Sequence, residues 1–276
     1  MANFNFDVVV KIGSMALIRK EDNDLDYNIF SRLAAALKPG MILVSSGATE
    51  IGRIDYMKRH GGMELKGDLE EIKTDYSAQG QSILMSLYRD FVRPEYSVRQ
   101  VLVEHSHFND PMKAEHIKKM LFRAANQNAI PIINYNDAVS NKENMHMELH
   151  DLRNAGEKVV ECIDNDETAA VISRLVGARQ LVLLTSVEGI YTDPNDPGTL
   201  VETVTGKTFD EVDAQIEKLI GCCKGASRVG TAGASAKLTF AREALKNGTS
   251  VTIAHARHHL RDILSGNVKC TRLTLK

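Results

Sequence analysis

The chain has 276 residues, of which 43% are hydrophobic and 25% charged, and its formal net charge is -2. These values are typical of a globular protein with a substantial core, and they argue against long disorder, a fibrous repeat or a strongly basic nucleic-acid-binding protein. No segment approaches the roughly 20 apolar residues that cross a bilayer, and the N-terminus lacks a signal-peptide pattern. We therefore expect a cytoplasmic protein with neither a membrane nor a nucleic-acid partner.

The cysteines show neither zinc-site spacing nor a disulfide framework. They are Cys162, Cys222, Cys223 and Cys270. We expect reduced thiols, with a redox pair of Cys222 and Cys223 as the alternative. His146 and His150 share a possible helix face, but no Glu follows the first of them directly as it does in zinc proteases, which favours surface histidines.

Six short apolar runs bounded by turn residues predict buried strands. They cover residues 8–12, 41–44, 98–103, 130–133, 181–184 and 251–253. Helical patterns alternate with them at 27–37, 81–91, 117–126, 168–175 and 236–245. This alternation predicts an α/β fold around a mainly parallel sheet, in which the ligand site lies beyond the carboxyl ends of the strands.

Two polar stretches interrupt the alternation. Residues 53–77 include Gly61, Gly62 and Gly67, and they predict a mobile excursion or a small insertion. Residues 140–158 predict a hairpin or flap near the site.

The first predicted strand runs into Lys11, Gly13 and Ser14. A lysine at a strand end followed by a glycine turn lets an ammonium and nearby backbone N–H groups reach a polyphosphate. A lysine at the edge of an ordinary turn is the alternative. The pattern alone does not separate the two.

The second predicted strand ends in Ser45, Ser46, Gly47 and Ala48. Hydroxyls and a glycine at a strand-to-helix turn can bind an anion or carboxylate with backbone donors. The alternative is a helix cap, in which Ser46 accepts a backbone N–H.

Polar side chains follow the strand at 130–133, namely Asn134, Asn136 and Asp137. At the carboxyl end of a buried strand they can bind an amino group and a carboxylate together, or they can build an Asx turn. We favour a ligand role because the buried strand is a rigid platform.

An acidic cluster, Asp164-Asn165-Asp166-Glu167, precedes the predicted helix at 168–175. Carboxylates complement a helix N-terminus, and Asp166 could be its cap. The functional alternative is that the cluster holds magnesium or orients lysines.

The fifth predicted strand ends in Thr185 and Ser186, and a turn-rich loop containing Tyr191 follows. Further along, the glycine-rich stretch 230–234 leads to Lys237 on a predicted helix. Glycine-rich backbone before a helix that bears a lysine suggests phosphate binding, although the spacing does not match the Walker pattern.

Taken in order over nearly the whole chain, these segments resemble the amino acid kinase family and, within it, the glutamate 5-kinases. The segments that carry the resemblance are 8–13, 43–48, Gly80-Gln81, 131–134, 136–139, 164–166, 183–185, 189–192 and Lys237-Leu238. The resemblance implies a three-layer α/β sandwich with a mainly parallel central sheet. It places an amino-acid-binding lobe at 1–172 and an ATP-binding lobe at 173–276, in one continuous domain.

The implied reaction transfers the γ-phosphoryl group of ATP to the side-chain carboxylate of L-glutamate, in the first step of proline biosynthesis, with ATP and Mg²⁺ as cofactors. The implied catalytic residues are Lys11 and Lys237, which contact the transferring phosphoryl group, and Asp166, which holds the lysines in place. The implied acid-binding residues are Ser46, Gly47, Asn134, Asp137 and Asn165. The implied nucleotide-binding residues are Gly13, Ser14, Thr185, Ser186, Tyr191, Gly230, Thr231 and Gly233.

No catalytic base and no protein ligand to a metal are assigned, because a carboxylate is already a nucleophile at neutral pH. The resemblance further implies a small-molecule substrate and a homo-oligomer. Many relatives carry an RNA-modification-type (PUA) domain at the carboxyl end, and we expect none within this chain.

Three positions depart from the family pattern. Ser186 stands where an Asp is usual, Ala232 where a Gly is usual, and Tyr135 where a Glu is usual. The alternatives are therefore a kinase of the same fold that acts on another small carboxylate, a carbamate or a phosphate, and a non-catalytic nucleotide or amino acid sensor. Retention of both lysines with Asp166 speaks against the sensor.

Overall fold

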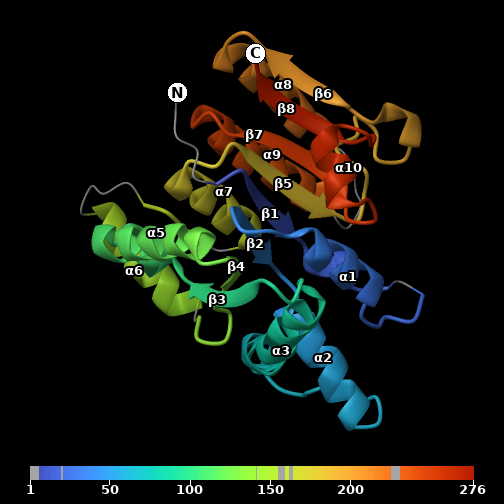
Figure 1. Ribbon diagram of the computed structural model, residues 1–276, viewed down its shortest axis with the longest axis vertical. Coiled ribbons are helices and arrows are strands. Elements are labelled where there is room, and N and C mark those ends of the chain that lie inside the picture. Colours follow the sequence, from blue (N-terminus) through green and yellow to red (C-terminus); the bar gives the residue numbers. More distant parts are fainter. Residues whose placement is uncertain (1–5, 20, 141, 155–158, 162–163, 225–230) are drawn as a thin grey trace.

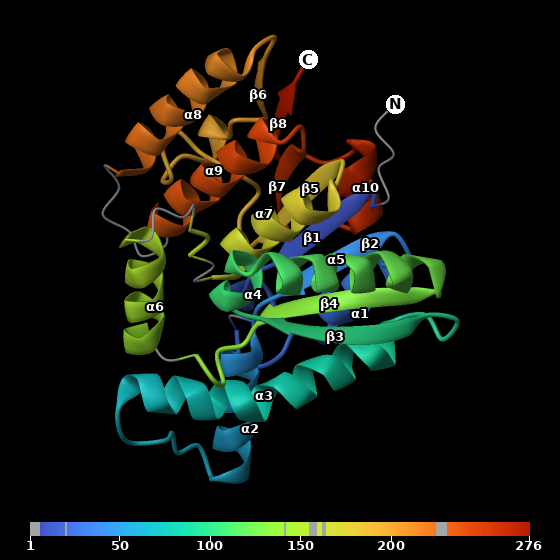
Figure 2. The ribbon, with the colours of Figure 1, turned by 90° about the vertical axis from the view of Figure 1, so that its left-hand side faces the viewer.

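The computed structural model describes residues 6–19, 21–140, 142–154, 159–161, 164–224 and 231–276. Within them, eight strands form one sheet in the order β3-β4-β2-β1-β5-β7-β8-β6, seen from two directions in Figures 1 and 2. The strands are β1 Val8–Ile12, β2 Met41–Ser45, β3 Ser97–Val103, β4 Ala129–Tyr135, β5 Gln180–Thr185, β6 Thr203–Gly206, β7 Ser250–His255 and β8 Thr271–Leu275. All neighbouring pairs are parallel except β7 and β8.

Helices cover both faces of the sheet, which confirms the predicted three-layer α/β sandwich (Figures 1 and 2). The helices are α1 Tyr27–Ala36, α2 Ala48–Arg59, α3 Leu69–Phe91, α4 His105–Asn109, α5 Pro111–Asn126, α6 Lys142–Asn154, α7 Asn165–Val176, α8 Phe209–Lys224, α9 Thr231–Lys246 and α10 Leu260–Ser265. Helices α5, α7, α8 and α9 pack on one core, while α1, α3 and α10 pack on the other. Along β1 the side chains alternate between these cores: Val9 enters the first, and Val8 and Val10 enter the second.

All six predicted strands are present, with every end within two residues of its predicted position. Two strands, β6 and β8, were not predicted. Both lie at one edge of the sheet, and their apolar residues alternate with threonines and other polar residues instead of forming a continuous run. Such half-buried edge strands lack the signal that identifies a strand buried on both faces.

The prediction of a mobile excursion or small insertion at 53–77 missed two helices, because α2 and α3 form a packed pair on either side of a loop at 60–68. The two helices meet at Gly52 and Gly80. A Cβ atom at Gly80 would lie 1.8 Å from the carbonyl oxygen of Ala48, and one at Gly52 would lie 1.8 Å from that of Tyr76. The two backbones are therefore in direct contact, and each contact requires a glycine.

The prediction of a hairpin at 140–158 was wrong for residues 142–154, which form helix α6, while residues 155–158 lie outside the described residues. Met145 and Leu149 are its buried residues on one face. His146 and His150 are both exposed on this helix, as expected for surface histidines.

The described thiols of Cys222 and Cys270 are free. Cys162 and the side chain of Cys223 lie outside the described residues, so the redox-pair alternative is not tested. Among the described residues, no helix is both long and apolar enough to span a membrane.

We predict that Gly80→Ala will lower the free energy of unfolding by about 1–3 kcal/mol, because the added methyl group forces α2 and α3 apart. Urea denaturation measures the change. The matched control is Gly221→Ala on α8, where the added methyl group would have no atom within 4 Å. There the substitution should stabilise by about 0.5–1 kcal/mol through helix propensity. Unchanged stability of Gly80→Ala would contradict the close packing.

Candidate active site

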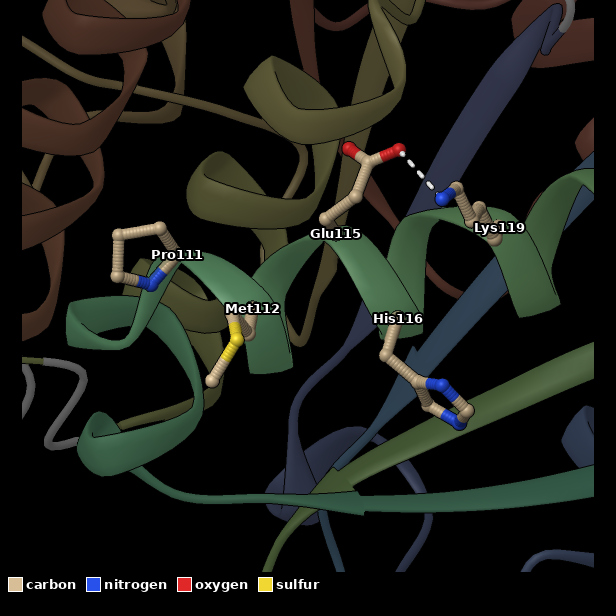
Figure 3. A pocket seen from close by; sticks show the side chains of 5 residues that line it. All are labelled: Pro111, Met112, Glu115, His116 and Lys119. Carbon is tan, nitrogen blue, oxygen red and sulfur yellow. Dashed lines mark ion pairs between the residues drawn. The ribbon is translucent and has the colours of Figure 1, made fainter.

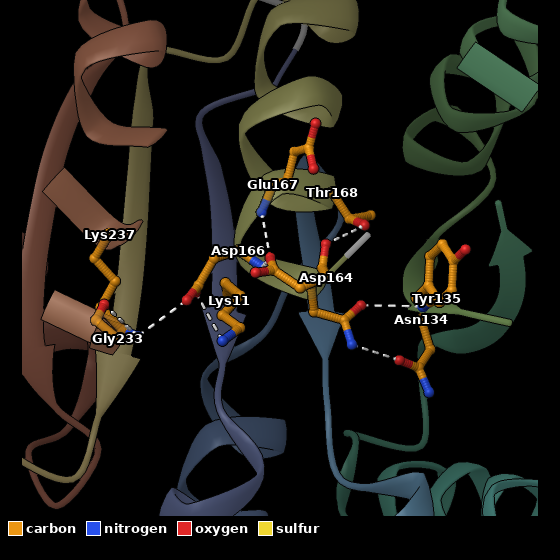
Figure 4. Close-up of polar contacts among 10 residues, drawn as sticks. Lys11, Asn134, Tyr135, Asp164, Asp166, Glu167, Thr168, Gly233 and Lys237 are labelled. Carbon is orange, nitrogen blue, oxygen red and sulfur yellow. Dashed lines mark hydrogen bonds and ion pairs between the residues drawn. The ribbon is translucent and has the colours of Figure 1, made fainter. Parts of the chain in front are cut away.

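Two lysines share one carboxylate where β1, α7 and α9 meet. The Nζ of Lys11 lies 2.7 Å from Oδ1 of Asp166, and the Nζ of Lys237 lies 2.9 Å from Oδ2 of the same residue (Figure 4). Lys11 and Asp166 are 6% and 7% exposed, so the cluster is largely removed from water. Two ammonium groups and one carboxylate leave a net charge of +1, which attracts an anion.

Helix α7 holds Asp166 in place through the cap of its first turn. Oδ1 of Asp164 accepts hydrogen bonds from the backbone N–H groups of Asp166 at 2.7 Å and Glu167 at 2.8 Å. The hydroxyl of Thr168 donates to the carbonyl oxygen of Asp164 at 2.8 Å. The cap is therefore Asp164, and the suggestion that Asp166 is the cap was wrong. Because Asp164 binds the backbone, the carboxylate of Asp166 is available to the lysines.

Opposing influences act on the pKa of Asp166. Burial raises it most strongly, but the charges and hydrogen bonds of Lys11 and Lys237 together outweigh burial, so the pKa lies below its ordinary value. Asp166 is therefore ionised at neutral pH, and it serves as a fixed counter-ion that keeps both ammonium groups in the site.

Beside this cluster, the side-chain amides of Asn165 and Asn134 form a hydrogen-bonded pair. Nδ2 of Asn165 donates to Oδ1 of Asn134 at 2.9 Å, and Oδ1 of Asn165 accepts from the backbone N–H of Tyr135 at 3.0 Å. Figure 4 shows Asn134 on the side of Asp164 away from Lys237. The structure thus joins the carboxyl end of β4 to the start of α7, and it brings two predicted acid-binding residues together.

The carboxyl end of β2 is fixed by hydrogen bonds to its neighbours. The hydroxyl of Ser45 donates its proton to the carbonyl oxygen of Ser46 at 2.9 Å. Because that proton is used, the Ser45 oxygen accepts a hydrogen bond from the hydroxyl of Tyr88 at 2.8 Å. The backbone N–H of Ser46 donates to the carbonyl of Ile12 at 3.0 Å, which joins this turn to β1. Burial raises the pKa of Tyr88, so its hydroxyl remains protonated and donates.

Gly47 is the residue that turns the chain from β2 into α2. Its φ of 109° is a left-handed conformation, and a Cβ atom here would lie 2.9 Å from Cδ1 of Leu17. Gly47 is also the N-cap of α2, and no side chain caps this helix. The alternative interpretation of Ser46 as the cap was therefore wrong.

Asn136 and Asp137 have different surroundings. Nδ2 of Asn136 donates to Glu104 at 3.0 Å, away from the amide pair. Asp137 is half-buried, and burial is the main reason why its pKa lies above the ordinary value, with Lys73 opposing and Glu70 adding to the shift. A carboxylate in this setting gains from a cationic ligand group, whose charge offsets the cost of burial.

Tyr135 points away from the amide pair, as Figure 4 shows. It is 4% exposed, and its hydroxyl lies 3.0 Å from the hydroxyl of Ser140 and 3.7 Å from the sulfur of Met145 on α6. The ring therefore anchors α6. Its departure from the family pattern does not place an aromatic ring against Asn134.

The predicted nucleotide-binding residues lie mostly at the carboxyl ends of β1 and β5 and the start of α9. The backbone N–H of Gly13 donates to the carbonyl of Leu184 at 3.3 Å, and Ser14 follows it in a short 3₁₀ helix, Ser14–Ala16. The carbonyl of Gly233 accepts from Nζ of Lys237 at 3.4 Å. Thr231 begins α9, whereas Gly230 and the side chains of Thr231 and Ala232 lie outside the described residues.

The loop after β5 is held by the predicted nucleotide-binding residue Thr185 and by contacts of Glu188 with distant residues. The hydroxyl of Thr185 accepts from the backbone N–H of Val187 at 2.9 Å, so it closes the first turn while Ser186 lies within it. Glu188 then pairs with Arg257 and with Nε2 of His258, the latter at 2.6 Å. These partners are about 70 residues away in the chain, and no local pattern signals such a contact.

Tyr191 lies further along the same loop, where it forms an isolated antiparallel bridge with Leu200. The neighbouring backbone N–H of Ile190 donates to the hydroxyl of Thr271 on β8 at 2.8 Å. The loop is thus tied to the sheet.

A hollow lies on the outer side of α5 (Figure 3). It is lined by Pro111, Met112, Glu115, His116 and Lys119. All of them belong to one helix, and Glu115 is paired with Lys119 at 3.7 Å. The hollow therefore offers no set of polar groups converging from several elements.

Known proteins provide an independent comparison. The family model described as "Amino acid kinase family" matches residues 8–255. Glutamate 5-kinase 1 of Bacillus licheniformis is 30% identical over 94% of this chain and 67% of the relative, and glutamate 5-kinase of Clostridium perfringens is 30% identical over 94% of this chain and 91% of the relative. The chain thus spans about two thirds of the first relative and most of the second.

Among solved structures, Giardia carbamate kinase resembles this chain with a TM-score of 0.60 and 15% sequence identity, over 98% of this chain and 99% of that one. At this identity the likeness concerns the fold, and it agrees with the sheet and helix layers described above.

Proposed function

This chain belongs to the amino acid kinase family and is an ATP-dependent kinase that acts on a carboxylate, and on that premise we propose that its acceptor is the side-chain carboxylate of L-glutamate. The product would be glutamyl 5-phosphate, as in the first step of proline biosynthesis. The observation that carries the proposal is the pair of lysines on the buried Asp166, next to the Asn134–Asn165 amide pair. Charged groups for a phosphoryl group and polar groups for an acid thus lie side by side.

We assign the roles by position. Lys11 and Lys237 serve the transferring phosphoryl group, and Asp166 keeps them in place. Ser46, Gly47, Asn134, Asp137 and Asn165 bind the acid. Gly13, Ser14, Thr185, Ser186, Tyr191, Gly230, Thr231 and Gly233 serve the nucleotide. Apart from Gly13 and Ser14, this assignment agrees with an acid-binding part at 1–172 and an ATP-binding part at 173–276.

In the proposed reaction, an oxygen of the acid's carboxylate forms a bond to the γ-phosphorus of ATP. The bond from that phosphorus to the bridging oxygen breaks, and ADP leaves with the electron pair. No proton has to move, so no general base is needed. Catalysis then consists of positioning the reactants and stabilising the charge on the transferring oxygens, which two ammonium groups can do.

Magnesium fits this chemistry as a partner of the nucleotide phosphates, where it would neutralise negative charge. Among the described residues, no group of three or more His, Cys, Asp or Glu side chains could hold a metal ion. The positive lysine cluster suits the polyphosphate itself.

Two other functions make different predictions. The fold likeness to a carbamate kinase leaves open another small carboxylate, a carbamate or a phosphate as the acceptor. A non-catalytic sensor would bind nucleotide or amino acid without turnover, and it would not need two lysines on one carboxylate to stabilise charge that develops during phosphoryl transfer. We further propose, on the resemblance alone, that the protein is a cytoplasmic homo-oligomer.

We predict that L-glutamate with ATP and Mg²⁺ will give an acyl phosphate that hydroxylamine traps, since the site offers groups for an amino group and for two carboxylates. N-acetylglutamate and aspartate should be much poorer acceptors in the same assay. A much higher kcat/KM for another acid would refute glutamate as the acceptor but keep the kinase. Nucleotide binding without turnover of any acid would favour the sensor.

Lys11→Ala and Lys237→Ala should each lower kcat by about 10²- to 10³-fold, with modest changes in either KM, because these groups act on charge that develops during transfer. Steady-state kinetics in both substrates measures the effects. The double substitution should cost less than the product of the single effects, since both lysines serve one phosphoryl group. Wild-type kcat in either single variant would remove that lysine from the mechanism.

The raised pKa of Asp137 predicts a pH dependence specific to an amino group on the acid. As the pH falls through that pKa, Asp137 becomes protonated and loses its attraction for the ammonium of glutamate, so kcat/KM for glutamate should fall. Glutarate lacks the amino group, and its inhibition constant should be less sensitive to pH. The difference should disappear in Asp137→Asn. Equal pH dependence of both acids would show that Asp137 does not bind the amino group.

A further inference from the structure

We infer that Gln81 is a positioning residue. It does not touch the acid, but it orients Asn134 and Asn165, which bind the acid. This inference rests on the proposed function, because it concerns the same acid site. The observation behind it is a hydrogen bond of 2.7 Å from Nδ2 of Asn134 to Oε1 of Gln81, 53 residues apart in the chain. It extends the pair of amides at the site to a row of three.

The direction of every hydrogen bond in this row is set at one end. A backbone N–H can only donate, so the N–H of Tyr135 requires that Asn165 present Oδ1 to it. Asn165 then presents Nδ2 to Oδ1 of Asn134 at 2.9 Å, and Asn134 presents its own Nδ2 to Gln81. Gln81 must therefore accept, and its oxygen fixes the orientation of both asparagine amides.

The position of Gln81 is set by the packing of α3. The preceding residue, Gly80, lies against the backbone of Ala48 at the start of α2. Seven residues further along α3, on the same face, Tyr88 bonds Ser45 at the end of β2. One helix thus supports the ends of two strands, β4 through Gln81 and β2 through Tyr88, and those ends carry Asn134 and Ser46.

The amide nitrogen of Gln81, Nε2, supports an indirect role for this residue. This nitrogen is buried and has no hydrogen-bond partner among the described residues. A donor that contacted the acid directly would face open space in the ligand-free site, whereas this nitrogen is shielded. The functional atom of Gln81 is therefore Oε1, which Asn134 already occupies.

Removal of the Gln81 acceptor should weaken binding of the acid and not binding of ATP. Without an acceptor at position 81, Nδ2 of Asn134 loses its partner, and the side-chain amide of Asn134 is free to rotate. Asn165 then loses the acceptor that holds its own Nδ2. Because leaving such a buried polar group unpaired is costly, the site should bind the acid less tightly.

Gln81→Met, which keeps the length of the side chain but removes the strong acceptor, should raise the KM for L-glutamate about 10-fold or more. The kcat should stay within about threefold, and the KM for ATP should be unchanged. Gln81→Glu should restore the KM to within about threefold of wild type, because a carboxyl group keeps an oxygen that accepts from Asn134 in either protonation state.

The matched control is Gln79→Met on the same helix. Gln79 is also half-buried, and its Nε2 donates to Asp55 of α2 at 2.6 Å, so the control loosens α3 without touching the row of amides. It should leave the KM for the acid unchanged. If it raises this KM as much as Gln81→Met does, the effect comes from the helix packing and the inference is wrong.

A double-mutant cycle with Asn134→Ala provides a second test that does not depend on the rescue. Because Gln81 acts through Asn134, Gln81→Met should add little to the loss already caused by Asn134→Ala. Additive effects would overturn the inference, as would a stable Gln81→Glu protein that is as impaired as Gln81→Met.

The wild-type protein separates this inference from the proposed function. If it phosphorylates no L-glutamate, the proposed acceptor is wrong. The same variants are then measured with whichever small acid the wild-type protein does phosphorylate. If it phosphorylates glutamate and Gln81→Met has a wild-type KM, the inference alone fails.

Discussion

The sharing of Asp166 by Lys11 and Lys237 is the interaction on which the rest of the site depends. Removing three charged groups from water is costly, and their mutual attraction offsets that cost only when the geometry is held firmly. Here β1, the capped start of α7 and the first turns of α9 supply the three groups, so elements from both halves of the chain meet at one carboxylate. The unbalanced positive charge that remains is what makes the cluster a site for an anion.

On the proposed acid side of the site, Asp137 is a charged group, whereas the side-chain amides of Asn134 and Asn165 are neutral. These asparagines are oriented by a row of hydrogen bonds that starts at a backbone N–H and ends on α3. Helix α3 can reach this point because glycines let it lie against α2. The precision of the site therefore depends on backbone contacts between helices that carry none of its charged groups.

Much of the fold and part of the site could be predicted from the sequence. Strands buried on both faces form continuous apolar runs. The polar residues at the ends of two such runs pointed to Lys11 and Asn134, which lie in the lysine cluster and the amide pair. The prediction failed where tertiary contacts decide the outcome. The glycines and polar residues of 53–77 suggested a loop over the whole stretch, whereas the loop covers only 60–68 and the flanking residues belong to α2 and α3. Asp164 rather than Asp166 caps α7, and Gln81 is identified only by a partner 53 residues away.

The two lysines should act on the transition state more than on bound ATP. The most direct test is the affinity for MgADP with aluminium fluoride and L-glutamate, a mimic of the transferring phosphoryl group, compared with the affinity for a non-hydrolysable ATP analogue. Calorimetry on wild type, Lys11→Ala and Lys237→Ala gives both values. Each substitution should weaken binding of the mimic far more than binding of the analogue. Equal weakening of both would contradict this role of the lysines.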